Sequence, residues 1–308
     1  MERIKRITVI TFLVLFLSAV VIFALLFYES GKTEDIYQKA MEAIENKEWE
    51  DAYGFVKQVP HYKSAEEVEK YIYPVMNYSK EYDTIEEKLG NMELVDAYID
   101  ANLEAMQDEE YKKNLSDLKE TIAFQKEKLN VLLEYDKETK LLDEGIQLIS
   151  NGKLEEAKDQ LAALTSMRFS KEKKQLSAYV DLLQAAAIED NKAIRIAASS
   201  LDPAYTGTMG EEIKTSVVQY VKENDWYKLY QTAEAKAQEI QNEPVEGDVP
   251  KVSTIASIGD SRSAVIKLMG SPSSSQVIDN SFGRCEKLIY TGGIAVYIED
   301  GEVTAVKG

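Results

Sequence analysis

Residues 7–28 form a run of 22 residues without a charged side chain, and this run most restricts how the chain can fold. As a helix it would be roughly 33 Å long, which is enough to cross a hydrocarbon core of about 30 Å. A cleaved signal peptide has a shorter apolar core of about 7–15 residues, followed by a small-residue cleavage site. Here Ser18, Ala19 and Val20 lie inside the run, and more apolar residues follow them. We therefore expect an uncleaved transmembrane helix, with a cleaved signal peptide as the main alternative and a buried helix of a soluble protein as the remaining one.

The charges beside this run indicate its orientation. Residues 1–6 contain three basic side chains and one acidic side chain. Positively charged flanks of a membrane span stay on the cytoplasmic side. No second apolar run of comparable length follows. The sequence therefore predicts a single-pass protein of the cell membrane, with a cytoplasmic tip at residues 1–6 and residues 29–308 outside the cytoplasm.

The overall charge and the rarity of Cys and His exclude several classes of function. The chain has 36 basic and 54 acidic residues, a net charge of −18, with one Cys and one His. It lacks the basic excess that a nucleic-acid binder needs to neutralise phosphates. One Cys excludes an internal disulfide and a thiolate metal cluster, and one His excludes a multi-histidine metal site. Residues 1–6 carry +2 and residues 253–308 carry −1, so the acidity belongs to the middle, where we expect a neutral or cationic partner.

The middle of the chain, residues 33–241, is predicted to be helical. Gly and Pro are sparse there, and apolar residues recur at steps of three and four, as in helices that bury one face. The clearest stripes are Val68, Tyr71, Ile72 and Val75; Leu115, Leu118, Ile122, Leu129 and Leu132; and Leu176, Tyr179, Val180, Leu182 and Leu183. The expected fold class is therefore mainly α.

A short sequence pattern is repeated within this helical region, and we call it the internal echo. Residues 44–52 (IENKEWEDA) and 149–157 (ISNGKLEEA) share the pattern apolar-x-Asn-x-x-apolar-acid-acid-Ala, and residues 224–230 are a weaker copy. Each copy predicts a tight turn between two antiparallel helices, with Asn or Gly as the left-handed residue that ends the first helix. The pattern resembles the hairpins of tetratricopeptide-type repeats, which implies stacked hairpins with a long concave surface. Since the copies do not follow a ~34-residue period, we expect an irregular α-solenoid.

A long coiled coil or spectrin-like rod, as in membrane-tethered division regulators, is the alternative arrangement. Residues 78–142 are highly charged and would suit a rod. No clean heptad pattern persists there for several repeats, so the solenoid is the preferred interpretation.

Composition changes after Gln241. Residues 242–252 contain two Pro and a Gly and are typical of a linker, and residues 253–308 hold 7 of the 15 Gly in the chain. In this C-terminal module, a short helix around residues 265–269 is predicted to be capped by Asp260 or Ser261 and ended by Gly270.

Strands are predicted to follow this helix after a Ser-rich loop. Residues 285–290 and 303–306 are the outer two, and residues 294–299 alternate as in a half-buried strand. Gly292-Gly293 and Asp300-Gly301 predict the two turns. We therefore expect a small α+β module in which one helix packs on a three-stranded antiparallel meander.

The first segment of the module has a recognisable sequence pattern. Residues 258–272 (IGDSRSAVIKLMGSP) resemble the first segment of the small α+β modules of outer-membrane assembly lipoproteins and β-lactamase inhibitor proteins. Tyr290 and Asp300-Gly301 fill the later places of that pattern, a Tyr-bearing strand and a glycine hairpin. The resemblance implies a module that acts by binding other proteins, and it carries no catalytic residues.

The residues that could carry chemistry do not form a coherent catalytic pattern. His61 lies in a segment between predicted hairpins, and Cys285 begins a strand in the other region. Ser170 and Lys173 match a Ser-x-x-Lys spacing, but no companion motif follows. No Gly-rich phosphate loop or calcium loop is present. We expect no catalytic residues, no cofactor and no metal site.

Aromatic residues are the best candidates for contacts with a partner, because aromatic side chains anchor interfaces. The chain has 18 Tyr and 2 Trp, and packing in the core is the competing role for most of them. The candidate partner-binding residues are Tyr37, Trp49, Tyr53, Tyr62, Trp226, Tyr290 and Tyr297.

Taken together, these patterns predict a membrane-anchored, non-enzymatic scaffold of the bacterial cell envelope. Its helical repeats and its C-terminal module, residues 253–308, would bind a protein partner. A structural or regulatory rod in division or envelope assembly is the first alternative. An envelope enzyme or sensor with an unrecognised site is the second.

Overall fold

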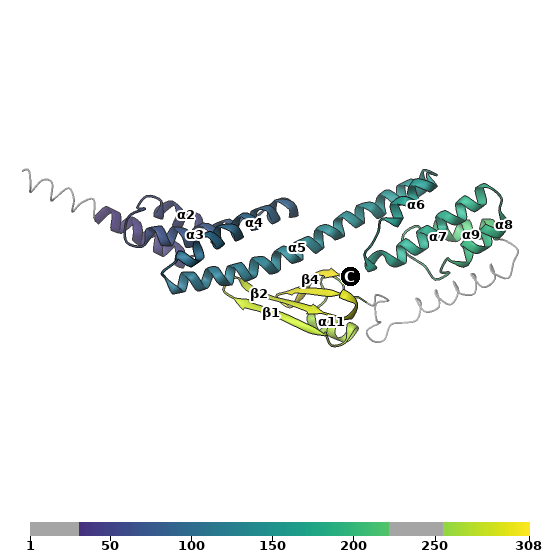
Figure 1. Cartoon of the computed structure of the whole chain (residues 1–308). Helices are drawn as coiled ribbons and strands as arrows, with labels where there is room; N and C mark the ends of the chain where they lie inside the picture. Colours follow the sequence, from purple (N-terminus) through teal and green to yellow (C-terminus); the bar gives the residue numbers. More distant parts are fainter. Residues whose placement is uncertain (1–30, 222–254) are drawn as a thin grey trace, which may run out of the picture. The chain divides into compact units, whose positions relative to one another are not determined.

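The computed structural model describes residues 31–221 and 255–308 (Figure 1). The predicted membrane span 7–28, the weaker repeat copy 224–230 and the linker 242–252 lie outside the described residues. Among the helices that the structure describes, none is long and apolar enough to span a bilayer.

The described chain divides into two compact units. Unit 1 comprises residues 31–126 and 280–282, and unit 2 comprises residues 127–221, 255–279 and 283–308. The fold is mainly helical with a small antiparallel sheet near the C-terminus, as the sequence predicts.

In chain order the elements are a helix over residues 31–45, α2 (Trp49–Val56), α3 (Ala65–Tyr78), α4 (Ile85–Asn102), α5 (Glu109–Ser150), α6 (Leu154–Ala162), α7 (Ser170–Ala187), α8 (Asn191–Ser199), α9 (Gly210–Tyr220), α11 (Arg262–Met269), β1 (Ser274–Asn280), β2 (Gly283–Ile289), β3 (Ala295–Glu299) and β4 (Glu302–Lys307).

The predicted apolar stripes form the helical cores. All four residues of the stripe in α3 are buried, as are Leu115, Leu118, Ile122 and Leu129 in α5. In α7 the stripe continues into the main cluster of unit 2, which also takes side chains from α6, α8 and α9. The three- and four-residue spacing therefore identifies which face of each of these helices is buried.

The two described turns of the internal echo share one geometry. In each copy the second residue after Asn donates its N–H to the carbonyl five residues earlier, and the residue between donates to the carbonyl three residues earlier. The left-handed residue is Lys47 (φ 62°) in the first copy and Gly152 (φ 71°) in the second. The prediction is therefore correct for Gly152 and wrong for Asn46, because this hydrogen-bond pattern puts the left-handed residue one position later.

The echo extends well beyond the turn. α2 begins at Trp49 and α6 at Leu154, while α3 begins at Ala65 and α7 at Ser170, so both offsets are 105 residues (154 minus 49, and 170 minus 65). Buried residues recur at the same offset, in the pairs Ala52 and Ala157, Val56 and Leu161, and Val59 and Leu164. Each unit therefore contains one copy of a repeat that spans the end of one helix and the two helices after it.

The C-terminal sheet has four strands in the order β1-β2-β3-β4. The expected three-stranded meander is wrong, because the Ser-rich stretch at residues 274–280 forms β1 instead of a loop. β2 pairs with β3 and β3 with β4, both antiparallel. The predicted turns are confirmed by positive φ angles at Gly292, Gly293, Asp300 and Gly301.

α11 forms where the module was expected to have its helix. Ser261 is the N-cap, since its hydroxyl accepts a hydrogen bond from the N–H of Ala264 at 3.2 Å. Asp260 instead accepts from the N–H of Ser257. Gly270 ends the helix with φ 80°, a conformation that favours glycine.

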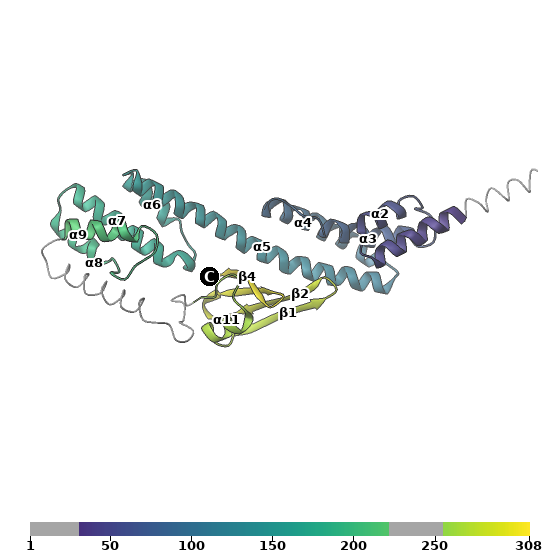
Figure 2. The same cartoon turned by 180° about the vertical axis from the view of Figure 1, so that it is seen from behind.

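Both faces of the sheet are covered within unit 2. Leu288 and Val296, which are partners across β2 and β3, pack with Val265 of α11. On the other face, Lys128 of α5 forms an ion pair with Glu299 at 2.6 Å. Figures 1 and 2 show the sheet alongside α5 from opposite sides. The half-buried prediction for β3 is therefore wrong: residues 295–298 are all buried, because α5 covers the face that would otherwise meet solvent.

Candidate functional site

Four of the predicted partner-binding residues lie in an aromatic cluster of unit 1. Tyr37 meets Tyr62 edge to face at 5.7 Å, Trp49 meets Tyr71 at 6.3 Å, and Tyr53 meets Tyr73 at 5.9 Å. Tyr37 is buried, and the other three candidates keep part of their surface exposed. These rings therefore pack against other rings of unit 1, and three of the four candidates also keep some surface exposed.

Glu34 binds the segment that follows α2. Its carboxylate pairs with Lys63 at 2.7 Å and also accepts hydrogen bonds from Tyr62 and Gln38. The hydrogen bonds from Lys63, Tyr62 and Gln38 lower the pKa of Glu34 to about 2. Lys63 has a left-handed backbone (φ 47°), so this exposed contact holds a non-glycine residue in an unfavourable conformation.

Two further predicted aromatic residues, Tyr290 and Tyr297, are buried in unit 2. Tyr297 has no exposed surface, and its pKa is raised by burial and by its contact with Glu127 of α5. Tyr290 is buried and donates a hydrogen bond to the carbonyl of Gly270 at 3.3 Å. Trp226 lies outside the described residues. In this module the tyrosines contribute to the core.

Unit 2 has an apolar groove between α6, α7 and α8, with a volume of about 730 Å³. We name it the apolar groove; its lining residues are Gly152, Leu154, Glu155, Asp181, Gln184, Ala185, Ala187, Ile188, Ala193, Ile196, Ala197 and Ser200. Ile188 is 74% exposed and Ile196 is 59% exposed, which is unusual for isoleucine.

The polar side chains of the apolar groove have partners within the chain. Gln184 donates to Glu155 at 2.9 Å, and Asp181 forms an ion pair with Lys158 at 2.7 Å. These two contacts hold polar side chains of the lining, and most of the remaining lining residues are apolar.

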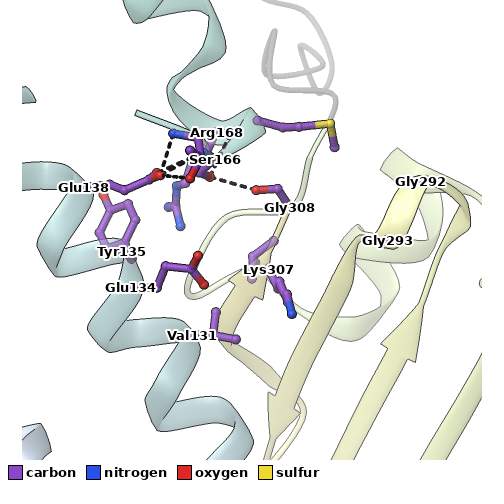
Figure 3. A pocket seen from close by; sticks show the side chains of 13 residues that line it. Val131, Glu134, Tyr135, Glu138, Ser166, Arg168, Gly292, Gly293, Lys307 and Gly308 are labelled. Atoms are coloured by element: carbon purple, nitrogen blue, oxygen red, sulfur yellow. Dashed lines mark hydrogen bonds between the residues drawn. The ribbon is translucent and has the colours of Figure 1, made fainter. Parts of the chain in front are cut away.

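A second, smaller cavity of about 190 Å³ lies between α5, the segment before α7 and the sheet (Figure 3). We name it the polar pocket; its lining residues are Val131, Glu134, Tyr135, Glu138, Thr165, Ser166, Met167, Arg168, Gly292, Gly293, Val306, Lys307 and Gly308.

Glu138 organises one wall of the polar pocket. Its Oε1 accepts from the N–H and the hydroxyl of Thr165, both at 2.7 Å, and from the N–H of Ser166 at 2.9 Å. Ser166 in turn donates its hydroxyl hydrogen to the carbonyl of Gly308 at 2.8 Å. Burial by itself raises the pKa of Glu138, but the hydrogen bonds from Thr165 and Ser166, together with the charge of Lys173, outweigh it and lower the pKa.

The other residues considered for chemistry are His61, Cys285, Ser170 and Lys173. His61 is exposed in the segment after α2, and Cys285 is buried in β2. Lys173 donates to the carbonyls of Ala162 and Leu164, so it is engaged with the main chain beside Ser170. In the part of the chain that the structure describes, no group of Asp, Glu, His and Cys side chains could hold a metal ion.

Comparison of the chain with protein-family models, with curated proteins and with solved structures returned no match. The resemblances to tetratricopeptide-type hairpins and to lipoprotein modules therefore stay hypotheses.

Neither cavity was predicted from the sequence. The exposed Ile188 and Ile196 are eight residues apart, a spacing that places them on similar sides of a continuous helix, but the chain turns between them at Glu189 (φ 57°). The polar pocket joins residues 131–138 and 165–168 to residues 292–308, which follow more than 120 positions later, and no local pattern could have indicated that.

Proposed function

We propose that this chain is a single-pass, membrane-anchored and non-enzymatic scaffold of the bacterial cell envelope that binds a protein partner. The proposal keeps the predicted anchor at residues 7–28 and an irregular α-solenoid of helical hairpins outside the cytoplasm. The two copies of the repeat, one in each unit, support the solenoid, because stacked copies of one supersecondary unit are how such proteins build a core.

The observation that carries the proposal is the apolar groove. Two exposed isoleucines on the rim of a cavity of about 730 Å³ are suited to bury apolar side chains of another molecule. The acidic excess of the middle region favours a partner with basic flanks. The proposed occupant is therefore an amphipathic helix of a partner protein, apolar on one side and basic on the other.

The C-terminal module contributes through its edge and not through its faces. Because α11 and α5 cover the sheet, removal of residues 253–308 would expose the face of α5 that forms ion pairs with the sheet and would confuse any binding experiment. The exposed residues 274–277 of edge strand β1 are the part of the sheet that stays open to a partner.

A test of the groove uses a fluorescein-labelled helical peptide with Leu on one face and Lys on the other. We expect saturable binding to the full chain and a loss of tenfold or more in Ile188→Lys/Ile196→Lys. The same substitution at Ile258, which is 49% exposed in unit 2 but outside the groove lining, is the matched control. Equal binding by the groove variant and the control would refute the groove as the interface, and so would equal binding of a peptide with Glu in place of Lys.

The topology is tested separately. In cells that express the full chain, protease added outside the cytoplasmic membrane should digest residues 29–308 and leave a membrane-bound N-terminal fragment. Recovery of the chain in the soluble fraction, or complete protection from the protease, would refute the anchor.

One observation favours the rod as an alternative function. α5 is a single helix of 42 residues that belongs partly to each unit, and long helices are typical of structural rods. A solution scattering profile with the dimensions of an extended rod, together with no peptide binding, would favour the division or assembly regulator over the scaffold.

A further inference from the structure

Two cations occupy corresponding sequence positions in the two copies of the repeat. Lys63 and Arg168 are 105 residues apart, the same offset that relates the helix starts. Each lies over a tyrosine ring from the first helix of its copy. Lys63 Nζ is 5.3 Å from the centre of the Tyr37 ring, and Arg168 Cζ is 4.3 Å from that of Tyr135.

The two cations differ in what neutralises them. Lys63 has the carboxylate of Glu34 at 2.7 Å. In the second copy, Glu138 is the carboxylate near the corresponding place, but it accepts hydrogen bonds from Thr165 and Ser166 instead. No carboxylate in the described residues forms an ion pair with Arg168, which lines the polar pocket. The anion position that Glu34 fills in the first copy is therefore open in the second.

The polar pocket also presents a carboxylate. Glu134 lies one turn before Glu138 on α5 and lines the same cavity, and it forms no ion pair with a described residue. Figure 3 shows Glu134 reaching from α5 into the pocket, with the Lys307 side chain carried by β4 on the facing wall. A cation and an anion that both face one small cavity suit a ligand with both charges.

The volume of the pocket limits the size of that ligand. About 190 Å³ is below the range of roughly 300–1,000 Å³ that holds drug-sized ligands. The apolar part of the wall is small and comes from Val131, Tyr135 and Val306. A compact molecule with a short apolar group fits these limits better than a peptide or a cofactor.

We propose that the polar pocket binds a small amino carboxylate, such as a free amino acid. Its carboxylate pairs with Arg168, as Glu34 pairs with Lys63, and its ammonium group pairs with Glu134. Because the walls come from α5, from residues 165–168 and from the end of β4, the bound molecule holds the sheet against the helices of unit 2. This site is separate from the apolar groove and does not depend on the proposed scaffold function.

Calorimetric titration of the full chain tests the proposal with three probes of similar size. L-alanine carries both charges, propionate carries the carboxylate alone, and ethylammonium carries the amine alone. We expect saturable binding of L-alanine, roughly tenfold weaker binding of propionate, and no saturable binding of ethylammonium. Arg168→Gln should weaken L-alanine at least tenfold, whereas Arg195→Gln, at an exposed arginine of α8 outside the pocket, should leave it unchanged.

A second variant keeps the test decisive if Arg168→Gln fails to fold. Glu134 is exposed and forms no ion pair with a described residue, so Glu134→Gln should fold normally. It should lower the affinity for L-alanine to that for propionate and leave propionate unchanged. Absence of saturable L-alanine binding would overturn the site. Equal affinities for L-alanine and propionate in the unaltered chain would overturn the role of Glu134.

Discussion

The two copies of the repeat secure the segment after their second helix in different ways. In unit 1, Glu34 reaches Lys63 and Tyr62 through exposed side-chain contacts. In unit 2, Glu138 is only 4% exposed and accepts main-chain N–H groups of Thr165 and Ser166. Exposed ion pairs contribute little because water and salt screen them, whereas hydrogen bonds to a buried carboxylate are strong. The segment after the second helix is therefore held weakly in unit 1 and strongly in unit 2.

This difference also affects the cation in that segment. Where the carboxylate binds side chains, Lys63 is neutralised by the chain itself. Where the carboxylate binds the main chain, Arg168 is left facing a cavity. The two copies therefore differ in whether their cation forms an ion pair with a described carboxylate, and the proposed amino-carboxylate site is based on this difference.

The largest expected effect on stability comes from removing the buried Glu138 carboxylate, which accepts hydrogen bonds from Thr165 and Ser166. Glu138→Ala leaves the N–H groups of Thr165 and Ser166 without their acceptor and should lower the free energy of unfolding of unit 2 by about 3 kcal/mol. Glu34→Ala should cost unit 1 far less, because its contacts are exposed. Denaturant unfolding followed by hydrogen exchange resolves the two units. Equal losses in both units would contradict the comparison.

The lowered pKa of Glu138 predicts that the stability of unit 2 depends on pH. Because the folded-state pKa of Glu138 is lowered, its contribution is fully present above the ordinary value of 4.5 and is lost as the pH falls through the lower folded value. Glu138→Gln should remove that part of the acid sensitivity of unit 2. A Glu138→Gln variant with unchanged acid sensitivity would show that another group is responsible.

A middle-sized effect is expected where the paired helices approach each other. Ala52 and Ala157 have no exposed surface and occupy equivalent positions in the two copies. Leucine at either position should overpack the contact and cost about 1–3 kcal/mol. Ala162→Leu, at an exposed position of the same helix as Ala157, should stay within about 0.5 kcal/mol. Thermal unfolding of the three variants checks this, and a neutral Ala157→Leu would refute the close approach.

The smallest effect concerns the left-handed residue of each turn. Glycine adopts φ > 0 at no steric cost, whereas the Cβ atom of lysine makes this conformation unfavourable. Lys47→Gly should therefore stabilise unit 1 by up to about 1 kcal/mol, and Gly152→Lys should destabilise unit 2 by a similar amount. Chemical denaturation of the reciprocal pair measures both. Changes of the same sign would mean that the two turns are not equivalent.

Local patterns predicted the helices, their buried faces, an α11 cap at Asp260 or Ser261, and the turn at Asp300-Gly301. These features depend on residues within a few positions of each other, where periodicity and turn chemistry are informative. The patterns missed β1, because Ser274 and Ser275 are typical of loops and become a strand only by pairing with β2. They also misjudged β3, since the burial of Tyr297 depends on α5, more than 140 residues earlier.

The two cavities were beyond prediction for the same reason. Glu138, Arg168 and Lys307 meet only because three separate elements pack together, and none of them stands out within its own segment. The repeat offset was the one available signal, because it relates Arg168 to Lys63. It became meaningful only when the hydrogen bonds of Glu34 and Glu138 could be compared.

The position of Cys285 has a practical consequence. It is the only thiol in the chain, and it is 4% exposed inside β2. A thiol reagent can modify it only when the sheet opens, so the rate of labelling at neutral pH reports how often unit 2 opens locally. The unaltered protein thus carries an intrinsic reporter that can follow whether occupation of the polar pocket closes the sheet more firmly.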